Sequence, residues 1–271
     1  MSHAGCLHYD CRSELIMSST QRGFGQSSDR HLQDQVIHYL TDAGLRSGSN
    51  DVDFLDANEA ERAERFSRFL ARRYYRDRLH RGFRYSARLL GSEHAPANLM
   101  ETPAFDLILK SCVLGSLVTA RAVGDLVLSE FEGKRSEGWW TELLQYEFAF
   151  FVQLAASEPT PASSFPQRSL STVIREFQFS LPEIFESLRK RRVPEITRLV
   201  STTLLFSRTH HGTIYVVQLD ALACAVMHAV NGSRQPAEIA ECAGASQAET
   251  NRILEDLVSI GAVLPRLNKA A

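Results

Sequence analysis

The chain has 271 residues, of which 44% are hydrophobic and 23% are charged, and its formal net charge at pH 7 is -2. This composition is typical of a globular protein with one large or two ordinary domains. The near-neutral charge excludes a global electrostatic attraction to nucleic acid or anionic membranes. No apolar run approaches the roughly 20 residues that a membrane-spanning helix needs. We therefore predict a protein that does not bind a membrane. Its five cysteines form an odd, scattered set, which predicts a reducing cytoplasm as its compartment.

The first 30 residues are polar and aperiodic, and they lack the basic-then-apolar layout of a signal peptide. We expect a disordered N-terminal extension over residues 1–30. Met17 is a second candidate for the native start beside Met1, and the intact mass of the native protein would decide between them. Cys6 and Cys11 lie near two histidines, but their spacing matches no zinc pattern, so all five cysteines are interpreted as structural or incidental thiols.

Apolar residues at helical spacing predict an all-helical domain over residues 31–156. We expect helices at 31–43, at 59–90 after a cap at Asn58, at 102–131 and from 138 to 154. Phe66 and Phe69 are assigned to the apolar stripe of the second helix. The third helix is apolar on most of its surface, which predicts a central place in a bundle. Gly115 in it is expected to permit a kink or a close helix contact.

The helix expected at 59–90 carries ten arginines against four acidic residues. One interpretation is a solvated face, or internal pairing with acidic residues downstream such as Glu142 and Glu147. The other is a docking surface for an acidic partner or for phosphate, because arginine makes bidentate contacts with carboxylates and phosphates. The predicted partner-docking residues are Arg65, Arg72, Arg73 and Arg76.

A proline-containing polar stretch at 157–168 predicts a linker to a C-terminal domain at 169–271. Residues 170–180 and 181–192 are expected to be short helices. A β-hairpin follows, with strands at 202–206 and 213–218. Asp220, Pro236 and the Ser246–Glu249 capping box then open three helices. With a last short strand at 263–264, these elements predict a winged helix. The expected fold class is therefore mainly α: an N-terminal helical bundle followed by a C-terminal winged-helix (α+β) domain with a β-hairpin.

The sequence contains no phosphate-binding glycine loop, nucleophile elbow, metalloprotease helix or paired-cysteine zinc pattern. We therefore predict no catalytic residue and no metal ligand, and a binding protein or non-catalytic subunit rather than an independent enzyme.

Two uses of the C-terminal domain differ physically. A DNA reader needs a basic third helix, whereas the helix at 246–260 carries Glu249, Glu255 and Asp256, which oppose phosphate. The other use is peptide capture, in which an extended peptide pairs with the hairpin edge and its side chains enter a groove beside the third helix. Core packing would explain many of the same residues. The predicted peptide-binding residues are Ile214, Val216, Gln218, Ile253, Leu254 and Leu257.

The segments AVNGSRQPAEIAE at 229–241 and LEDLVSIGAVL at 254–264 resemble the leader-peptide recognition elements of ribosomal peptide biosynthesis. The wider layout over residues 55–265 is similar to the methanobactin biosynthesis protein C family and to its counterpart in the 3-thiaglutamate pathway. The resemblance implies a heterodimer with a multinuclear iron oxidative enzyme. In that heterodimer the partner would hold the iron and this chain would hold no cofactor. This chain would bind the leader of a precursor peptide whose cysteine is modified. The arginine-rich helix would then face the enzyme.

The alternative is a winged-helix transcriptional regulator that contacts DNA through Arg72 and Arg73 or through the basic run 189–192. Salt dependence separates the two hypotheses, because binding through several phosphates weakens steeply with salt and strand addition does not. An orphan scaffold protein is the third possibility.

Overall fold

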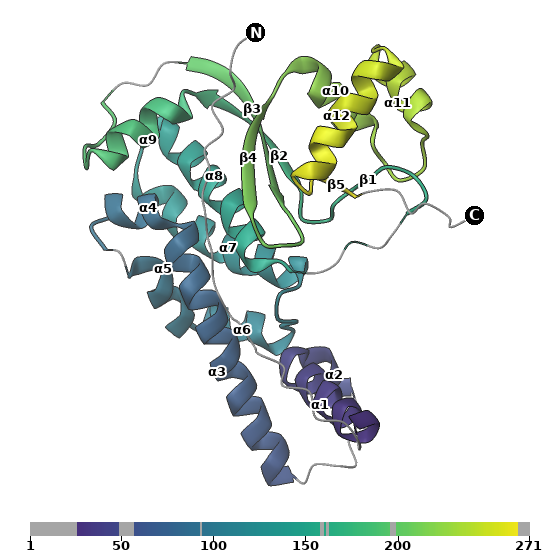
Figure 1. Cartoon of the computed structure of the whole chain (residues 1–271). Helices are drawn as coiled ribbons and strands as arrows, with labels where there is room; N and C mark the ends of the chain where they lie inside the picture. The colour runs from purple at the N-terminus through teal and green to yellow at the C-terminus, as the bar shows by residue number, and fades with distance from the viewer. Residues whose placement is uncertain are drawn as a thin grey trace.

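A computed structural model describes residues 26–48, 57–92, 94–157, 160, 163–195 and 199–264. The described chain is mainly helical, with a small antiparallel sheet (Figure 1). Most of the expected N-terminal extension lies outside the described residues, and its last part belongs to the first helix. The α-helices are α1 (Gln26–Thr41), α2 (Ala43–Gly48), α3 (Ala57–Gly82), α4 (Arg84–Leu89), α5 (Ala95–Asn98), α6 (Pro103–Lys110), α7 (Leu117–Phe131), α8 (Gly138–Ala155), α9 (Leu181–Arg189), α10 (Ala221–Ala229), α11 (Pro236–Ala243) and α12 (Gln247–Ser259).

Two 3-10 turns, η1 (Leu99–Glu101) and η2 (Glu132–Lys134), follow α5 and α7. The strands are β1 (Gln167–Arg168), β2 (Val173–Phe179), β3 (Leu199–Arg208), β4 (Ile214–Leu219) and β5 (Val263–Leu264). They form a three-stranded antiparallel sheet in the order β2-β3-β4 and a separate two-stranded pair of β1 with β5.

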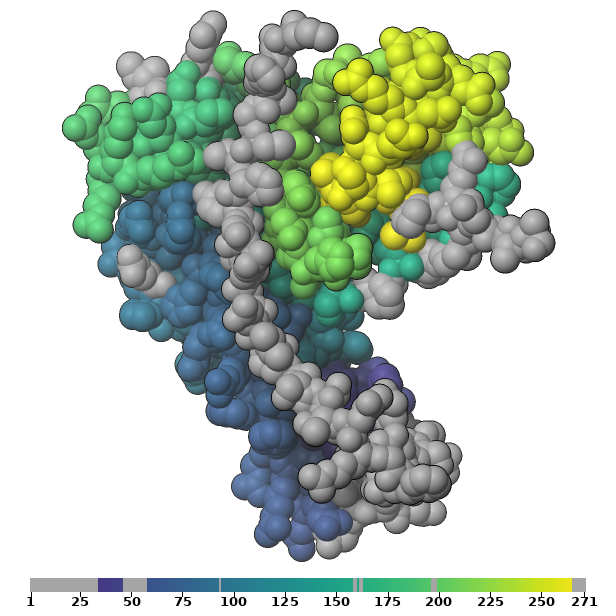
Figure 2. Space-filling model, in the orientation of Figure 1, coloured from purple at the N-terminus to yellow at the C-terminus, as the bar shows by residue number. Residues whose placement is uncertain are grey.

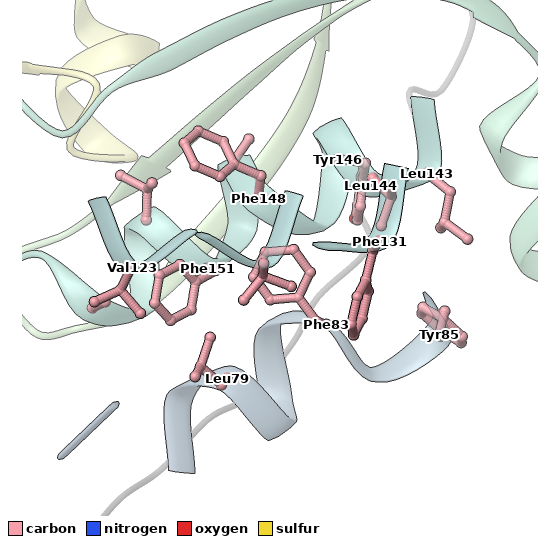
Figure 3. Packing of buried hydrophobic residues seen from close by; sticks show 14 of the residues in the cluster. Leu79, Phe83, Tyr85, Val123, Phe131, Leu143, Leu144, Tyr146, Phe148 and Phe151 are labelled. Atoms are coloured by element: carbon pink, nitrogen blue, oxygen red, sulfur yellow. The ribbon is translucent and has the colours of Figure 1, made fainter. Parts of the chain in front are cut away.

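The N-terminal core forms where α3, α7 and α8 meet. Figure 3 shows Leu79 of α3 and Phe83, which lies between α3 and α4, directed toward Phe151 of α8, with Val123 of α7 beside them. All four side chains are buried. Gly124 of α7 permits this close packing, because a Cβ at that position would overlap the ring of Phe148. The prediction of a helix from 138 onward with a buried aromatic face is confirmed.

The segment 102–131 forms two helices, so the prediction of one continuous helix there is wrong. Residues 111–116 separate α6 from α7. Gly115 has a φ of +79°, a left-handed conformation that favours glycine, and the Ser116 side chain accepts a hydrogen bond from the backbone amide of Thr119. The N-cap at Ser116 and the left-handed Gly115 therefore interrupt the helix, although the apolar pattern continues through both residues. The long helix expected at 59–90 is likewise divided into α3 and α4.

The helix expected at 170–180 is a strand, β2, and this is the main error in the predicted elements. Val173, Ile174 and Phe177 follow a helical spacing, and the exposed pair Arg175 and Glu176 interrupts the alternation that would identify a strand. The second lead-in helix, by contrast, is present as α9. The hairpin of β3 and β4 and the three following helices are present where the sequence predicts them, with the Asp220 cap and the Ser246–Glu249 capping box both formed.

The three-stranded sheet lies between two helical layers (Figure 1). Neighbouring residues of each strand point to opposite faces, so adjacent side chains enter different apolar clusters. The bundle side receives Val173, Phe177, Leu204, Phe206 and Val216. The opposite side, against α10, α11 and α12, receives Ile174, Leu205, Val217 and Leu219.

The end of the predicted linker also joins the C-terminal part. Arg168 of β1 pairs with Val263 of β5, and the carbonyl of Pro166 accepts a hydrogen bond from the amide of Gly232 at 3.0 Å. The division of the chain into a helical and a C-terminal domain stays a prediction, because the bundle cluster continues into the sheet.

Candidate functional site

The outer edge of β4 is the first feature that can bind another chain. Thr209 and Thr213 close the hairpin with a hydrogen bond from the amide of Thr209 to the carbonyl of Thr213, at 2.9 Å. Hydrogen-bonded and non-hydrogen-bonded pairs alternate along an antiparallel ladder. From this register, the backbone N–H and C=O groups of Ile214, Val216 and Gln218 point away from β3. No described strand lies on that side.

The other edge of the sheet, along β2, is partly closed. The amides of Gln178 and Phe179 donate to the two carboxylate oxygens of Glu142 of α8, at 2.7 and 2.9 Å. Arg175 and Glu176 add charged side chains to the exposed part of β2. Natural sheets block unpaired edges with charges, caps or bulges. β4, with the sequence IYVVQL, has no charged residue and no proline. It is therefore the edge better suited to strand addition.

The side chains of the six predicted peptide-binding residues do not surround one groove. Ile214 is buried, Val216 packs against the bundle cluster, and Gln218 is exposed. The α12 residues are in the opposite cluster, in which Leu254 and Leu257 are buried and Ile253 is half-buried. Leu254 also lines a hollow of about 460 Å³ between α12 and β5. The structure thus brings together the backbones of the three β4 residues, and it uses the three α12 side chains for packing.

The predicted docking arginines are largely occupied within the chain. Arg72 bonds Asp106 at 2.5 Å, and Arg65 and Arg76 lie 3.6 and 3.8 Å from Glu61 and Glu101. Arg73 differs from these, since it is exposed and no described carboxylate pairs with it. The internal-pairing interpretation therefore accounts for part of the arginine excess, and Arg73 remains available to a partner.

Phe66 and Phe69 are not core residues, contrary to their assignment from the sequence. They are 50% and 55% exposed, and their rings stack with centroids 6.4 Å apart. Helical spacing places both on the same side of α3 as Arg62 and Arg73. The exposed face of α3 is therefore aromatic and basic, which suits contact with another protein.

Glu142 and Glu147 accept from backbone amides, and no ion pair joins either carboxylate to a described arginine. Glu147 does bind the arginine-rich segment expected at 59–90, whereas Glu142 binds β2. Glu142 binds the β2 edge, and Glu147 accepts from the amides of Tyr85 and Ser86 at 2.6 and 3.0 Å. Glu147 is only 2% exposed, and burial raises the pKa of its carboxyl group to about 7. The only sequence signal for this buried group was its position between two aromatic residues, Tyr146 and Phe148.

A cavity of about 200 Å³ lies beside Glu147, where the end of α3 and the start of α4 meet α8. Four of its nine lining residues are aromatic or aliphatic, and three are basic residue types. The lining residues are His80, Arg81, Gly82, Arg84, Tyr85, Tyr146, Glu147, Phe150 and Leu154. Sequence reasoning missed this cavity, because its walls come from segments about 60 residues apart.

Known proteins offer no guide to these features, because no family model and no curated protein matches the chain. Within the described ranges, no helix is both long and apolar enough to cross a membrane. Among the same residues, no three His, Cys, Asp or Glu side chains gather as a metal site would require.

Proposed function

We propose that this chain is a non-catalytic partner subunit that binds the leader of a ribosomally made precursor peptide. It presents the cysteine-containing core of that peptide to a multinuclear iron-dependent oxidative enzyme, which forms a heterodimer with it and holds the iron. In this proposal the sheet and α10–α12 act as a winged-helix peptide-recognition domain.

The observation that carries the proposal is the open edge of β4. The backbone N–H and C=O groups of Ile214, Val216 and Gln218 point outward from this edge. The opposite edge of the sheet, along β2, is partly closed by Glu142. Strand addition derives its affinity from such main-chain groups. In Figure 2 the green atoms of the β3–β4 hairpin reach the surface between the blue atoms of α3 and the yellow atoms of α12. An added strand would therefore lie beside both helical layers.

The exposed face of α3 supports the second part of the proposal, a protein partner. Phe66, Phe69 and Arg73 combine aromatic area with positive charge, and aromatic residues and arginine are enriched at protein interfaces. The acidic outer face of α12, with Glu249, Glu255 and Asp256 exposed, makes contact with phosphate unfavourable there. That face disfavours the alternative of a DNA-binding regulator.

The test is co-expression with a multinuclear iron enzyme and a short cysteine-bearing peptide encoded by neighbouring genes. We expect a stable complex whose iron stays with the enzyme when the subunits are separated, and a peptide that is retained by this chain. A chain that purifies alone, ignores the peptide and shifts duplex DNA at physiological salt would contradict the proposal.

A variant of the edge tests strand addition directly. Gln218→Pro removes an outward amide without removing a bond to β3, and proline is tolerated on the open side of an edge strand. Gln218→Ala keeps the amide and removes the side chain, so it is the matched control. We expect Gln218→Pro to weaken retention of the peptide about tenfold, as expected for loss of a backbone hydrogen bond and part of the paired strand. Equal binding by both variants would count against strand addition.

A further inference from the structure

The cavity beside Glu147 has the size and lining of a pocket for one large side chain. Its volume of about 200 Å³ is below the roughly 300–1,000 Å³ of typical small-molecule sites. Tyr146, Phe150 and Leu154 supply an apolar wall along α8. Each carboxyl oxygen of Glu147 accepts from one backbone amide, that of Tyr85 or of Ser86, which holds the group at the start of α4.

The rim of the cavity is positively charged. Arg81 and Arg84 are exposed, and the Arg84 guanidinium lies 4.7 Å from the Tyr85 ring centroid and donates to its hydroxyl at 2.8 Å. Arg78 lies close by, since its Nε donates to the carbonyl of Leu154 at 3.0 Å. Burial, together with the positive charges of Arg81 and Arg208, lowers the pKa of Arg78. No ion pair joins any of these arginines to a described carboxylate.

Arg208 connects this basic cluster to the open edge. It is the last residue of β3 and pairs with Ile214, the first residue of β4. Its guanidinium donates to the carbonyls of Gln153 and Ala156 at 3.3 and 2.9 Å, on either side of the Leu154 carbonyl that holds Arg78. Arg78 and Arg208 therefore bind neighbouring backbone carbonyls at the end of α8, which connects the cavity wall at Leu154 to the Ile214 end of β4.

We propose that the cavity receives an apolar anchor side chain of an acidic peptide segment, whose carboxylates contact Arg81 and Arg84 and whose adjoining backbone pairs with β4. This inference rests on the proposed peptide-binding function and gives that peptide its chemistry. β4 runs from Ile214 to Leu219, so a strand added antiparallel to it ends at Ile214. The acidic anchor segment then follows the paired strand in the peptide sequence.

The probe is a fluorescein-labelled peptide, Thr-Val-Thr-Val-Gly-Glu-Phe-Glu-Asp, titrated with the full chain by fluorescence anisotropy. Replacing its Phe by Ala is expected to raise the Kd about thirty-fold, the effect typical of a hot-spot side chain. The double variant Arg81→Glu/Arg84→Glu is expected to weaken binding of the intact probe about tenfold or more. Lys110→Glu/Arg121→Glu is the matched control, because it also reverses two positive charges, at exposed residues outside the cavity lining.

Circular dichroism and thermal melting verify that each variant folds. Loss of binding in the cavity variant and with the Ala probe, but not in Lys110→Glu/Arg121→Glu, supports the pocket. If Arg81→Glu/Arg84→Glu binds the probe as wild type does and Gln218→Pro does not bind it, the pocket proposal is wrong and strand addition is supported. If Arg81→Glu/Arg84→Glu loses binding and Gln218→Pro keeps it, the pocket is supported and strand addition is wrong. A probe that does not bind the wild-type chain at all, or that binds every variant equally, overturns the pocket.

Discussion

Glu147 shows how one residue links burial to stability. Its carboxylate accepts two backbone amides at the start of α4, yet it is almost fully buried in an aromatic helix. Hydrogen bonds favour the charged form and burial disfavours it, and burial has the larger effect, because the pKa is raised to about 7. The group therefore holds a proton in the folded chain at pH values where it has lost one in the unfolded chain.

The sign of the resulting pH dependence follows from proton linkage. Between the ordinary pKa of 4.5 and the folded pKa of about 7, the folded chain binds more protons than the unfolded chain, so the free energy of unfolding falls as pH rises. The contribution is complete below about pH 4.5 and is lost above about pH 7, and the difference in pKa corresponds to roughly 3 kcal/mol.

Urea denaturation of wild type and Glu147→Gln from pH 4.5 to 8 measures this contribution. Glutamine has no titratable carboxyl group and only one oxygen to accept from the two backbone amides. We therefore expect the variant to have a lower free energy of unfolding than wild type at low pH, and this difference should shrink as pH approaches 7. Taking the difference cancels the titration of other carboxyl groups. A difference that is constant with pH would show that Glu147 keeps the same protonation state in both forms.

At the scale of elements, neighbouring arginines of α3 have opposite roles. Arg72 bonds Asp106 of α6 at 2.5 Å and donates to the carbonyl of Met100, whereas Arg73 is exposed without a described carboxylate partner. Arg72→Glu places two negative charges together, and we expect it to lower the free energy of unfolding by about 1–2 kcal/mol.

Arg73→Glu should change stability by less than about 0.5 kcal/mol, as is usual for surface substitutions, and should weaken co-purification with the proposed partner enzyme. Chemical denaturation and pull-down of the two variants separate the two roles. If Arg73→Glu retains the partner as well as wild type does, this face of α3 is not the docking surface.

The elements themselves were predictable to different degrees, for physical reasons. The helices of the C-terminal part carry their own start signals, since Asp220 and Ser246 cap locally and need no tertiary context. β2 lacks such a signal, because Arg175 and Glu176 interrupt its apolar–polar alternation and its partners in β3 lie 20 or more residues away in sequence. Phe66 and Phe69 follow the helical apolar period, yet the bundle covers only the opposite side of α3. The cavity beside Glu147 depends on α3, α4 and α8 meeting, and no single segment indicates it.

At the scale of the whole molecule, the sheet joins the two helical layers through alternating side chains. Leu205 and Phe206 are adjacent and fully buried, but Leu205 packs against α10–α12 and Phe206 packs against the bundle. The backbone of β3 is thus shared by both apolar clusters, so loss of either cluster exposes the sheet face that it covers. This arrangement makes the two layers depend on each other for stability.

We therefore expect the chain to unfold in a single calorimetric transition, and both Leu205→Ala and Phe206→Ala to lower the midpoint of that same transition. Each truncation should reduce the free energy of unfolding by about 3 kcal/mol, as for other large-to-small core substitutions. Differential scanning calorimetry of both variants beside wild type is the measurement. Two transitions, with each variant moving only one of them, would instead show that the bundle and the C-terminal part fold as independent domains. The single-transition result would mean that a peptide strand added to β4 stabilises both layers at once, because binding to the folded chain alone raises the stability of the whole cooperative unit.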